Sequence, residues 1–181
     1  MTVQSSNPDT QHYDTITIVL HWLVAILVAV LWVGGETLGW FSPAALHADA
    51  RSLHIVLGST LGVIGAIRFI WRLSFGRPLP PVDRGAIGIA SNLTHQGLYV
   101  LLAAMVFVGM LLLWSTGDSA FNYFEISPGT AANAGQASQL QSVHAIIGWM
   151  ILAAVGLHLV GVLFHRFVLG DGILTRMSLR R

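Results

Sequence analysis

Histidines are the residues of this sequence with the most distinctive chemistry. Four of them lie inside or at the edge of apolar segments: His21, His54, His144 and His158. Polar side chains are costly inside a lipid bilayer and are usually functional there. The chain has no cysteine, which excludes disulfides, thiolate zinc sites, iron–sulfur clusters and the covalent attachment of c-type haem. Histidine is therefore the strong ligand that this sequence offers to a metal or a haem.

The spacing of the four histidines predicts two ligand pairs at two depths. His144 and His158 are fourteen residues apart, so on a helix they share roughly one face and lie about 21 Å apart along the axis. One helix can therefore supply one axial iron ligand to each of two stacked haems. Depth in the membrane pairs His21 with His158 and His54 with His144. Two histidine ligands saturate haem iron, which suits electron transfer rather than oxygen chemistry.

Glycines accompany His54 along its predicted helix. Gly58, Gly62 and Gly65 follow it by 4, 8 and 11 residues, so we expect them on one face, where a haem could lie flat against the helix. Arg68, fourteen residues after His54, is expected at the depth of the other haem, where its guanidinium can pair with a propionate. Helix packing through Gly58 and Gly62 is the alternative for the glycines. For Arg68 the alternative is a simple interface anchor.

Four apolar segments are long enough to carry these residues through a membrane. The chain is 54% hydrophobic and 9% charged, whereas a soluble domain carries about a quarter charged residues. A span needs about 20 apolar residues and must be helical, because backbone groups in lipid need internal hydrogen bonds. The predicted spans run roughly over 16–38, 53–73, 93–114 and 143–169. The predicted fold class is an all-α integral membrane four-helix bundle.

The arginines predict how the bundle is oriented, since the chain has no lysine. Eight of the nine lie in the connection between the second and third spans, with its adjoining helix end, and at the C-terminal end. Arg51 alone lies in the other connections. The positive-inside rule therefore places both termini in the cytoplasm. The expected divisions are a flexible polar N-terminus over 1–14, a transmembrane di-haem domain over 15–170 and a cytoplasmic tail over 171–181.

Two further histidines keep the ligand assignment open on the cytoplasmic side. His95 is expected to open the third span, and His165 follows His158 by seven residues on roughly the same face. Either could replace a ligand in the pair of His21 and His158. The greater depth of His158 favours that residue, so we assign His95 and His165 to the inner interface or to a quinone site.

Several short motifs, in their order and spacing, resemble the bacterial cytochrome b561 family over nearly the whole chain. They are LHWL at His21, LHIVLGSTLGVIGAIRFIWRL at His54, LTHQGLY at His95, SVHAIIGW at His144, GLHLVGVLFH at His158 and the closing GDGILTRM. The resemblance implies an inner-membrane bundle with two b haems, whose axial ligands would be His21, His54, His144 and His158. It also implies quinone-linked electron transfer, with ubiquinone as acceptor, and for part of the family the oxidation of periplasmic superoxide.

We therefore predict a membrane di-haem b-type cytochrome that transfers electrons between a periplasmic donor, with superoxide as one candidate, and membrane quinone. The alternative is a haem-bearing anchor subunit of a dehydrogenase or hydrogenase-type complex, docked through the apolar loop 115–142. A third interpretation is a non-redox channel or metal transporter that uses the histidines for transient binding. The net charge of +1 gives no indication of a nucleic-acid partner.

Overall fold

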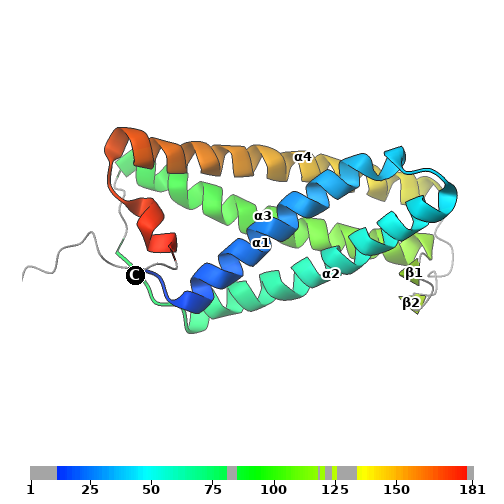
Figure 1. Cartoon of the computed structure of the whole chain (residues 1–181), viewed down its shortest axis with the longest axis horizontal. Helices are drawn as coiled ribbons and strands as arrows, with labels where there is room; N and C mark the ends of the chain where they lie inside the picture. Colours follow the sequence, from blue (N-terminus) through cyan, green and yellow to red (C-terminus); the bar gives the residue numbers. More distant parts are fainter. Residues whose placement is uncertain (1–11, 81–84, 118, 121–123, 126–133, 179–181) are drawn as a thin grey trace, which may run out of the picture.

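The computed structural model describes residues 12–80, 85–117, 119–120, 124–125 and 134–178. Four long helices form an antiparallel bundle in which α1 packs against α2 and α3 against α4, while α2 also contacts α3 (Figure 1). Their bounds are α1 (Thr15–Thr37), α2 (Ala44–Ser74), α3 (Gly85–Thr116) and α4 (Ala134–Phe164). The other elements are the 3-10 turn η2 (Leu38–Trp40), the antiparallel strands β1 (Ser119–Ala120) and β2 (Phe124–Glu125), the π-helical turn η3 (His165–Leu169) and the 3-10 turn η4 (Ile173–Met177).

The bundle has two distinct ends. We call the end that holds the start of α1, the α2–α3 connection and η4 the terminal end, and the end that holds the α1–α2 connection, β1 and β2 the distal end (Figure 1). The predicted flexible N-terminus lies largely outside the described residues, as do Arg84, Arg180, Arg181 and much of the predicted loop 115–142.

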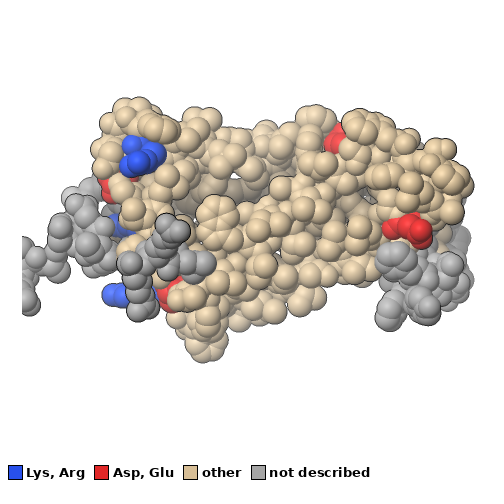
Figure 2. Space-filling view, in the orientation of Figure 1, with Lys and Arg blue, Asp and Glu red and all other residues tan. Residues whose placement is uncertain are grey.

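The surface of the bundle is apolar along its length. All four long helices are long and apolar enough to cross a membrane. Among the described hydrophobic side chains only Ile18, Val24, Leu61 and Ile151 are buried. Val100 and Phe107 in the middle of α3 are 67% and 64% exposed. Figure 2 shows the acidic and basic side chains of the visible face gathered towards its two ends. Such a surface suits lipid rather than water, and the predicted all-α architecture with four long apolar helices is confirmed.

Three of the helices begin earlier than the sequence predicts. They start at Ala44, Gly85 and Ala134, whereas hydropathy places the starts near residues 53, 93 and 143. The added turns contain small and polar residues, which are compatible with a helix but invisible to a search for apolar runs. A helix of 31 residues spans about 46 Å, against about 30 Å of hydrocarbon. His54, His95 and His144 consequently lie ten residues inside their helices rather than at the first turns.

Asp14 caps the first helix and ties it to α2. Its carboxylate accepts hydrogen bonds from the Thr17 backbone N–H at 2.9 Å, from the Thr17 hydroxyl at 2.7 Å and from the Trp71 indole Nε1 at 3.0 Å. The backbone N–H of Arg77 adds a fourth bond at 3.2 Å. Partial burial raises the pKa of Asp14, but the hydrogen bonds from Thr17, Arg77 and Trp71 outweigh it and lower the pKa to about 2. A side-chain oxygen at this position satisfies N–H groups that the first helical turn leaves unpaired.

The C-terminal segment folds back across the terminal end. The backbone N–H of Tyr13 donates to the carbonyl of Arg176 at 3.1 Å, and the Trp22 indole donates to the carbonyl of Met177 at 3.3 Å. Arg176 in turn donates through Nη1 to the carbonyl of Pro80, in the α2–α3 connection, at 2.9 Å. Residues from the start, the middle and the end of the chain are therefore joined at this end.

Replacing Asp14 by alanine should lower stability through the lost cap. We expect a loss of about 1 kcal/mol, which lowers the Tm in detergent by roughly 2–4 °C for a chain of this size. Asp14→Asn keeps an acceptor for the Thr17 N–H and removes the charge, together with the oxygen that accepts from the Thr17 hydroxyl and the Arg77 N–H. Because the pKa falls from 3.8 to about 2 on folding, the charge stabilises the fold above pH 3.8 and this contribution is lost as the pH falls towards 2. A Tm difference between wild type and Asp14→Asn that does not shrink over this pH range would contradict the assignment.

Candidate functional site

The bundle contains two histidine pairs, and each joins one of the first two helices to α4. His21 of α1 faces His158 of α4, with ring centroids 6.3 Å apart and ring planes at 66°. His54 of α2 faces His144 of α4, with centroids 6.4 Å apart and planes at 69°. The structure thus brings together the residues that the sequence pairs by depth. Because His144 and His158 are fourteen residues apart on one continuous helix, the two pairs lie one after the other along the bundle.

The spacing within each pair suits one metal ion between two imidazoles. A transition metal binds a histidine nitrogen at about 2 Å, so two rings on opposite sides of one ion have centroids roughly 6 Å apart. The observed separations of 6.3 and 6.4 Å agree with this geometry. A haem iron with two histidine ligands needs no further protein group, so each pair could supply a complete set of axial ligands.

Glycines let two helices approach the rings of His54 and His144. A Cβ built on Gly35 of α1 would lie 3.3 Å from Cε1 of His54. A Cβ built on Gly109 of α3 would lie 3.2 Å from Cε1 of His144. Sequence reasoning missed both glycines, although glycine inside an apolar helix is a recognisable sign of close approach. Each imidazole thus has the backbone of a glycine on one side and the imidazole of the other histidine on the opposite side.

The predicted glycine stripe on α2 divides into two kinds of position. A Cβ on Gly58 or Gly65 would meet no atom within 4 Å, whereas a Cβ on Gly62 would lie 2.9 Å from Cγ1 of Val106 in α3. At about 100° per residue, Gly58 and Gly65 lie within roughly 40° of His54 around the helix, but Gly62 lies about 80° away. Gly62 therefore meets the neighbouring helix, whereas Gly58 and Gly65 leave open space along the face of α2 that carries His54.

The pair at the distal end is incomplete in its polar contacts. The Nδ1 atoms of His54 and His144 are buried and have no hydrogen-bond partner within the described part of the chain. Buried polar atoms are normally satisfied, and an exception calls for an explanation such as a missing ion or ligand. With the ring spacing and the open space at Gly58, these atoms fit a site that binds a further group. The residues present therefore fit a haem.

Arg68 joins the site from α2. Its Nη1 donates to Nδ1 of His21 at 2.8 Å, and its Nε donates to the hydroxyl of Tyr99 in α3 at 3.4 Å. The guanidinium also lies over the Tyr99 ring, 5.7 Å from the centroid. Sequence reasoning placed Arg68 at this depth but missed Tyr99, because no pattern links a residue of α2 with one of α3. A positive charge therefore lies beside the His21–His158 pair.

His95 makes this pair a cluster of three histidines. Its ring lies 5.2 Å from that of His158, at 69°, and it hydrogen bonds to the backbone of Ser91. The His54–His144 pair shows no third ring contact among the described residues. His95 is therefore placed to assist or to replace a ligand at one pair only, as the sequence left open.

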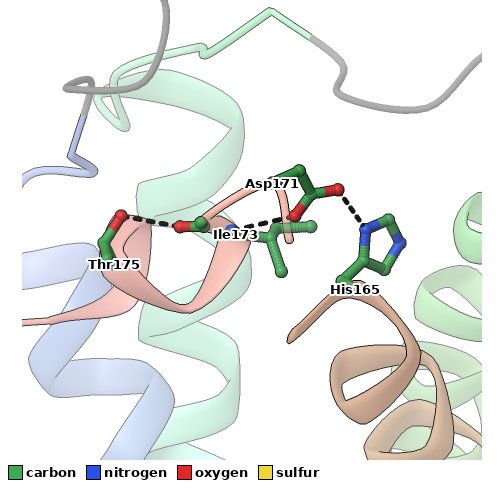
Figure 3. Close-up of polar contacts among 5 residues, drawn as sticks. His165, Asp171, Ile173 and Thr175 are labelled. Carbon is green, nitrogen blue, oxygen red and sulfur yellow. Dashed lines mark hydrogen bonds and ion pairs between the residues drawn. The ribbon is translucent and has the colours of Figure 1, made fainter. Parts of the chain in front are cut away.

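His165 lies apart from this cluster and pairs with a carboxylate. Its Nδ1 is 2.5 Å from Oδ2 of Asp171, while Oδ1 of Asp171 accepts from the backbone N–H of Ile173 at 3.1 Å (Figure 3). Gly170 and Gly172, with φ of 62° and 70°, form the turn that returns Asp171 to the histidine, since glycine adopts positive φ without strain. His165 is 6% exposed. The turn η3 after α4 thus holds a buried histidine that pairs with a partly exposed aspartate, which sequence spacing alone did not reveal.

An aromatic pair joins α1 to α4. Trp32 of α1 and Trp149 of α4 meet edge to face, with centroids 5.3 Å apart. Trp32 follows His21 by eleven residues, and Trp149 lies between His144 and His158. The two indoles therefore bridge α1 and α4 at a depth between the two candidate haem sites.

The sequence is similar to known proteins of one family. The pattern that defines the prokaryotic cytochrome b561 family matches residues 12–178. The probable superoxide oxidase CybB of Yersinia pestis is 30% identical over 169 residues, covering 91% of this chain and 94% of the relative. Cytochrome b561 homolog 1 of Escherichia coli is 30% identical over 171 residues, covering 91% and 95%.

A third relative carries a different name but shows the same extent of similarity. Cytochrome b562 of Cereibacter sphaeroides is 30% identical over 173 residues, covering 91% of this chain and 94% of the relative. The matches extend over all four membrane helices and both histidine pairs. Membership of a cytochrome b family implies a haem cofactor, which the paired histidines fit. The chain therefore belongs to the prokaryotic cytochrome b561 family and is a multi-pass membrane cytochrome.

Proposed function

We propose that this protein binds two b haems, one between His21 and His158 and one between His54 and His144, and transfers electrons along the bundle. The observation that carries the proposal is the pair of nearly equal ring separations, 6.3 and 6.4 Å, with α4 contributing one histidine to each pair. When bound, haem with two histidine ligands exchanges one electron at a time and leaves no position open for substrate on the iron.

The side chains of the bundle then have distinct tasks. The four histidines hold the two sites at different positions along the bundle. On an ideal helix, the fourteen residues between His144 and His158 correspond to about 21 Å along the axis of α4. Gly58, with open space above it, leaves room for a flat group beside His54, and Gly62 holds α2 close to α3. Arg68, close to His21, supplies a positive charge that can pair with a haem propionate.

We propose that the terminal end faces the cytoplasm. The described arginines of the α2–α3 connection and of the C-terminal segment support this orientation by the positive-inside rule: Arg72, Arg77, Arg166 and Arg176. The His54–His144 pair is then nearer the periplasm, and the His21–His158 pair is nearer the cytoplasm.

We further propose that electrons pass between a periplasmic donor and membrane quinone. Superoxide is the donor that the name of the Yersinia pestis relative suggests. Ubiquinone is the proposed acceptor, in the cytoplasmic half of the membrane near His95 and His165. Reduction of a quinone to a quinol takes two electrons and two protons, and the pair of buried His165 and partly exposed Asp171 offers a route for those protons from the cytoplasm.

The first test is an oxidised-minus-reduced absorption spectrum of the purified protein, with a pyridine haemochrome assay for stoichiometry. We expect b-type bands and two haems per chain, with reduction of a ubiquinone analogue by the reduced protein. One haem per chain would mean that one histidine pair is structural. A colourless protein from haem-supplied cells would overturn the proposal, and stoichiometric co-purification of a second subunit would favour the anchor function.

A further inference from the structure

The hydrogen bond between Arg68 and His21 restricts the protonation state of the histidine. A guanidinium carries only donors, so Nδ1 of His21, 2.8 Å from Nη1 of Arg68, must accept. A protonated imidazolium has no acceptor, and a neutral imidazole that accepts at Nδ1 carries its proton on Nε2. In this arrangement His21 is therefore a neutral ring with the proton on Nε2.

This hydrogen bond is incompatible with metal ligation by His21. If iron bound Nδ1, it would occupy the lone pair that now accepts from Arg68. If iron bound Nε2, the proton of the neutral ring would have to reside on Nδ1, and two donors would then face each other. Whichever nitrogen binds the metal, Arg68 must release His21.

We propose that Arg68 is a haem-loading residue that holds His21 before haem binds and exchanges it for a haem carboxylate afterwards. This inference rests on the proposed function, since it requires a haem between His21 and His158. Tyr99 keeps the guanidinium in place during the exchange, because it both accepts from Nε and lies beneath Cζ. The released charge needs an anionic partner in this low-dielectric setting, and a propionate supplies one through a charge-assisted hydrogen bond.

The other histidine pair provides an internal contrast. Neither Nδ1 of His54 nor Nδ1 of His144 has a hydrogen-bond partner within the described residues. Haem binding at the His54–His144 site therefore breaks no hydrogen bond at Nδ1 among the described residues, whereas at the His21–His158 site it requires an exchange. The proton of His21 moves from Nε2 to Nδ1 in that exchange if iron binds through Nε2, and no proton is gained or lost overall.

The test uses the full-length protein labelled with ¹⁵N-histidine, prepared haem-free from haem-depleted cells and again after loading with haem. In the haem-free protein we expect His21 to show the tautomer protonated at Nε2, and after loading the proton should reside on Nδ1. In Arg68→Leu the haem-free His21 should lose its preference for the Nε2 proton. Arg72→Leu is the matched control, because Arg72 is one turn further along α2 and lies over the Tyr13 ring.

The same variants give a second readout in the rate of haem release to an apo-globin acceptor. Loss of one charge-assisted hydrogen bond should speed release of one of the two haems about tenfold or more in Arg68→Leu, and leave Arg72→Leu at the wild-type rate. A His21 protonated on Nδ1 both with and without haem, or wild-type release rates in Arg68→Leu, would overturn the inference. A wild-type protein that binds no haem would instead remove the proposed function, and the haem-free tautomer would still report the Arg68–His21 contact.

Discussion

Replacing His54 by alanine should remove one haem and leave the other in place. His54 faces His144 alone, at the distal end, while His21 and His158 form a separate pair. The variant leaves His144 without an opposing ring, so the haem content measured by pyridine haemochrome should fall from two to one per chain. His21→Ala should give the same stoichiometry with loss of the other haem, recognisable by its different midpoint potential in a redox titration.

His47→Ala is the control for the His54 variant. His47 lies near the start of α2, two turns before His54, and makes none of the ring contacts that define the two pairs. It should retain two haems with unchanged potentials. Loss of both haems in a folded His54→Ala protein, or retention of both, would show that the pairing is wrong.

Replacing Gly109 by valine should displace the His144 ring and deplete the haem that it would hold. A Cβ alone would lie 3.2 Å from Cε1 of His144, and the two further methyl groups of valine leave the imidazole no room in its present position. We expect the haem content to approach one per chain, while Gly109→Ala should retain two haems because the ring need yield only a few tenths of an ångström.

Gly97→Val is the matched control for the Gly109 variant, since Gly97 lies on the same helix and its Cβ would meet no atom within 4 Å. Both substitutions change the helix propensity of α3 by the same amount. A difference in haem content between the two variants therefore reports the contact with His144. Two haems with wild-type potentials in Gly109→Val would contradict the positioning role of this glycine.

The four-helix architecture could be predicted because hydropathy responds to lipid, and lipid covers most of each helix. The helix starts at Ala44, Gly85 and Ala134 could not be predicted, since the first turns carry small or polar residues that a search for apolar runs does not detect. The histidine pairs could be predicted from helical periodicity and the order of the helices. Fourteen residues on one helix return to nearly the same face, and the order of the helices then sets the depth of each partner.

The remaining site contacts depend on how helices pack, which a single sequence does not encode as a pattern. Tyr99 meets Arg68, and Gly109 meets His144, only because neighbouring helices have particular rotations about their axes. Gly62 looked like part of one stripe with His54, but its offset of about 80° turns it towards Val106 instead. Asp171 lies between two glycines with positive φ, Gly170 and Gly172, and the turn that brings it to His165 is not predicted by spacing alone.

The pairing of α1 with α2 and of α3 with α4 divides the chain into two helical hairpins, each able to enter the membrane as a unit before the halves associate. Each histidine pair joins one residue of the first hairpin to one of the second. A haem held in this way links the two hairpins. Because it binds only when they are associated, its binding free energy stabilises the assembled protein. In cells short of haem, the steady-state amount of the protein should therefore be lower, because hairpins that no haem links dissociate more readily and are degraded by membrane proteases.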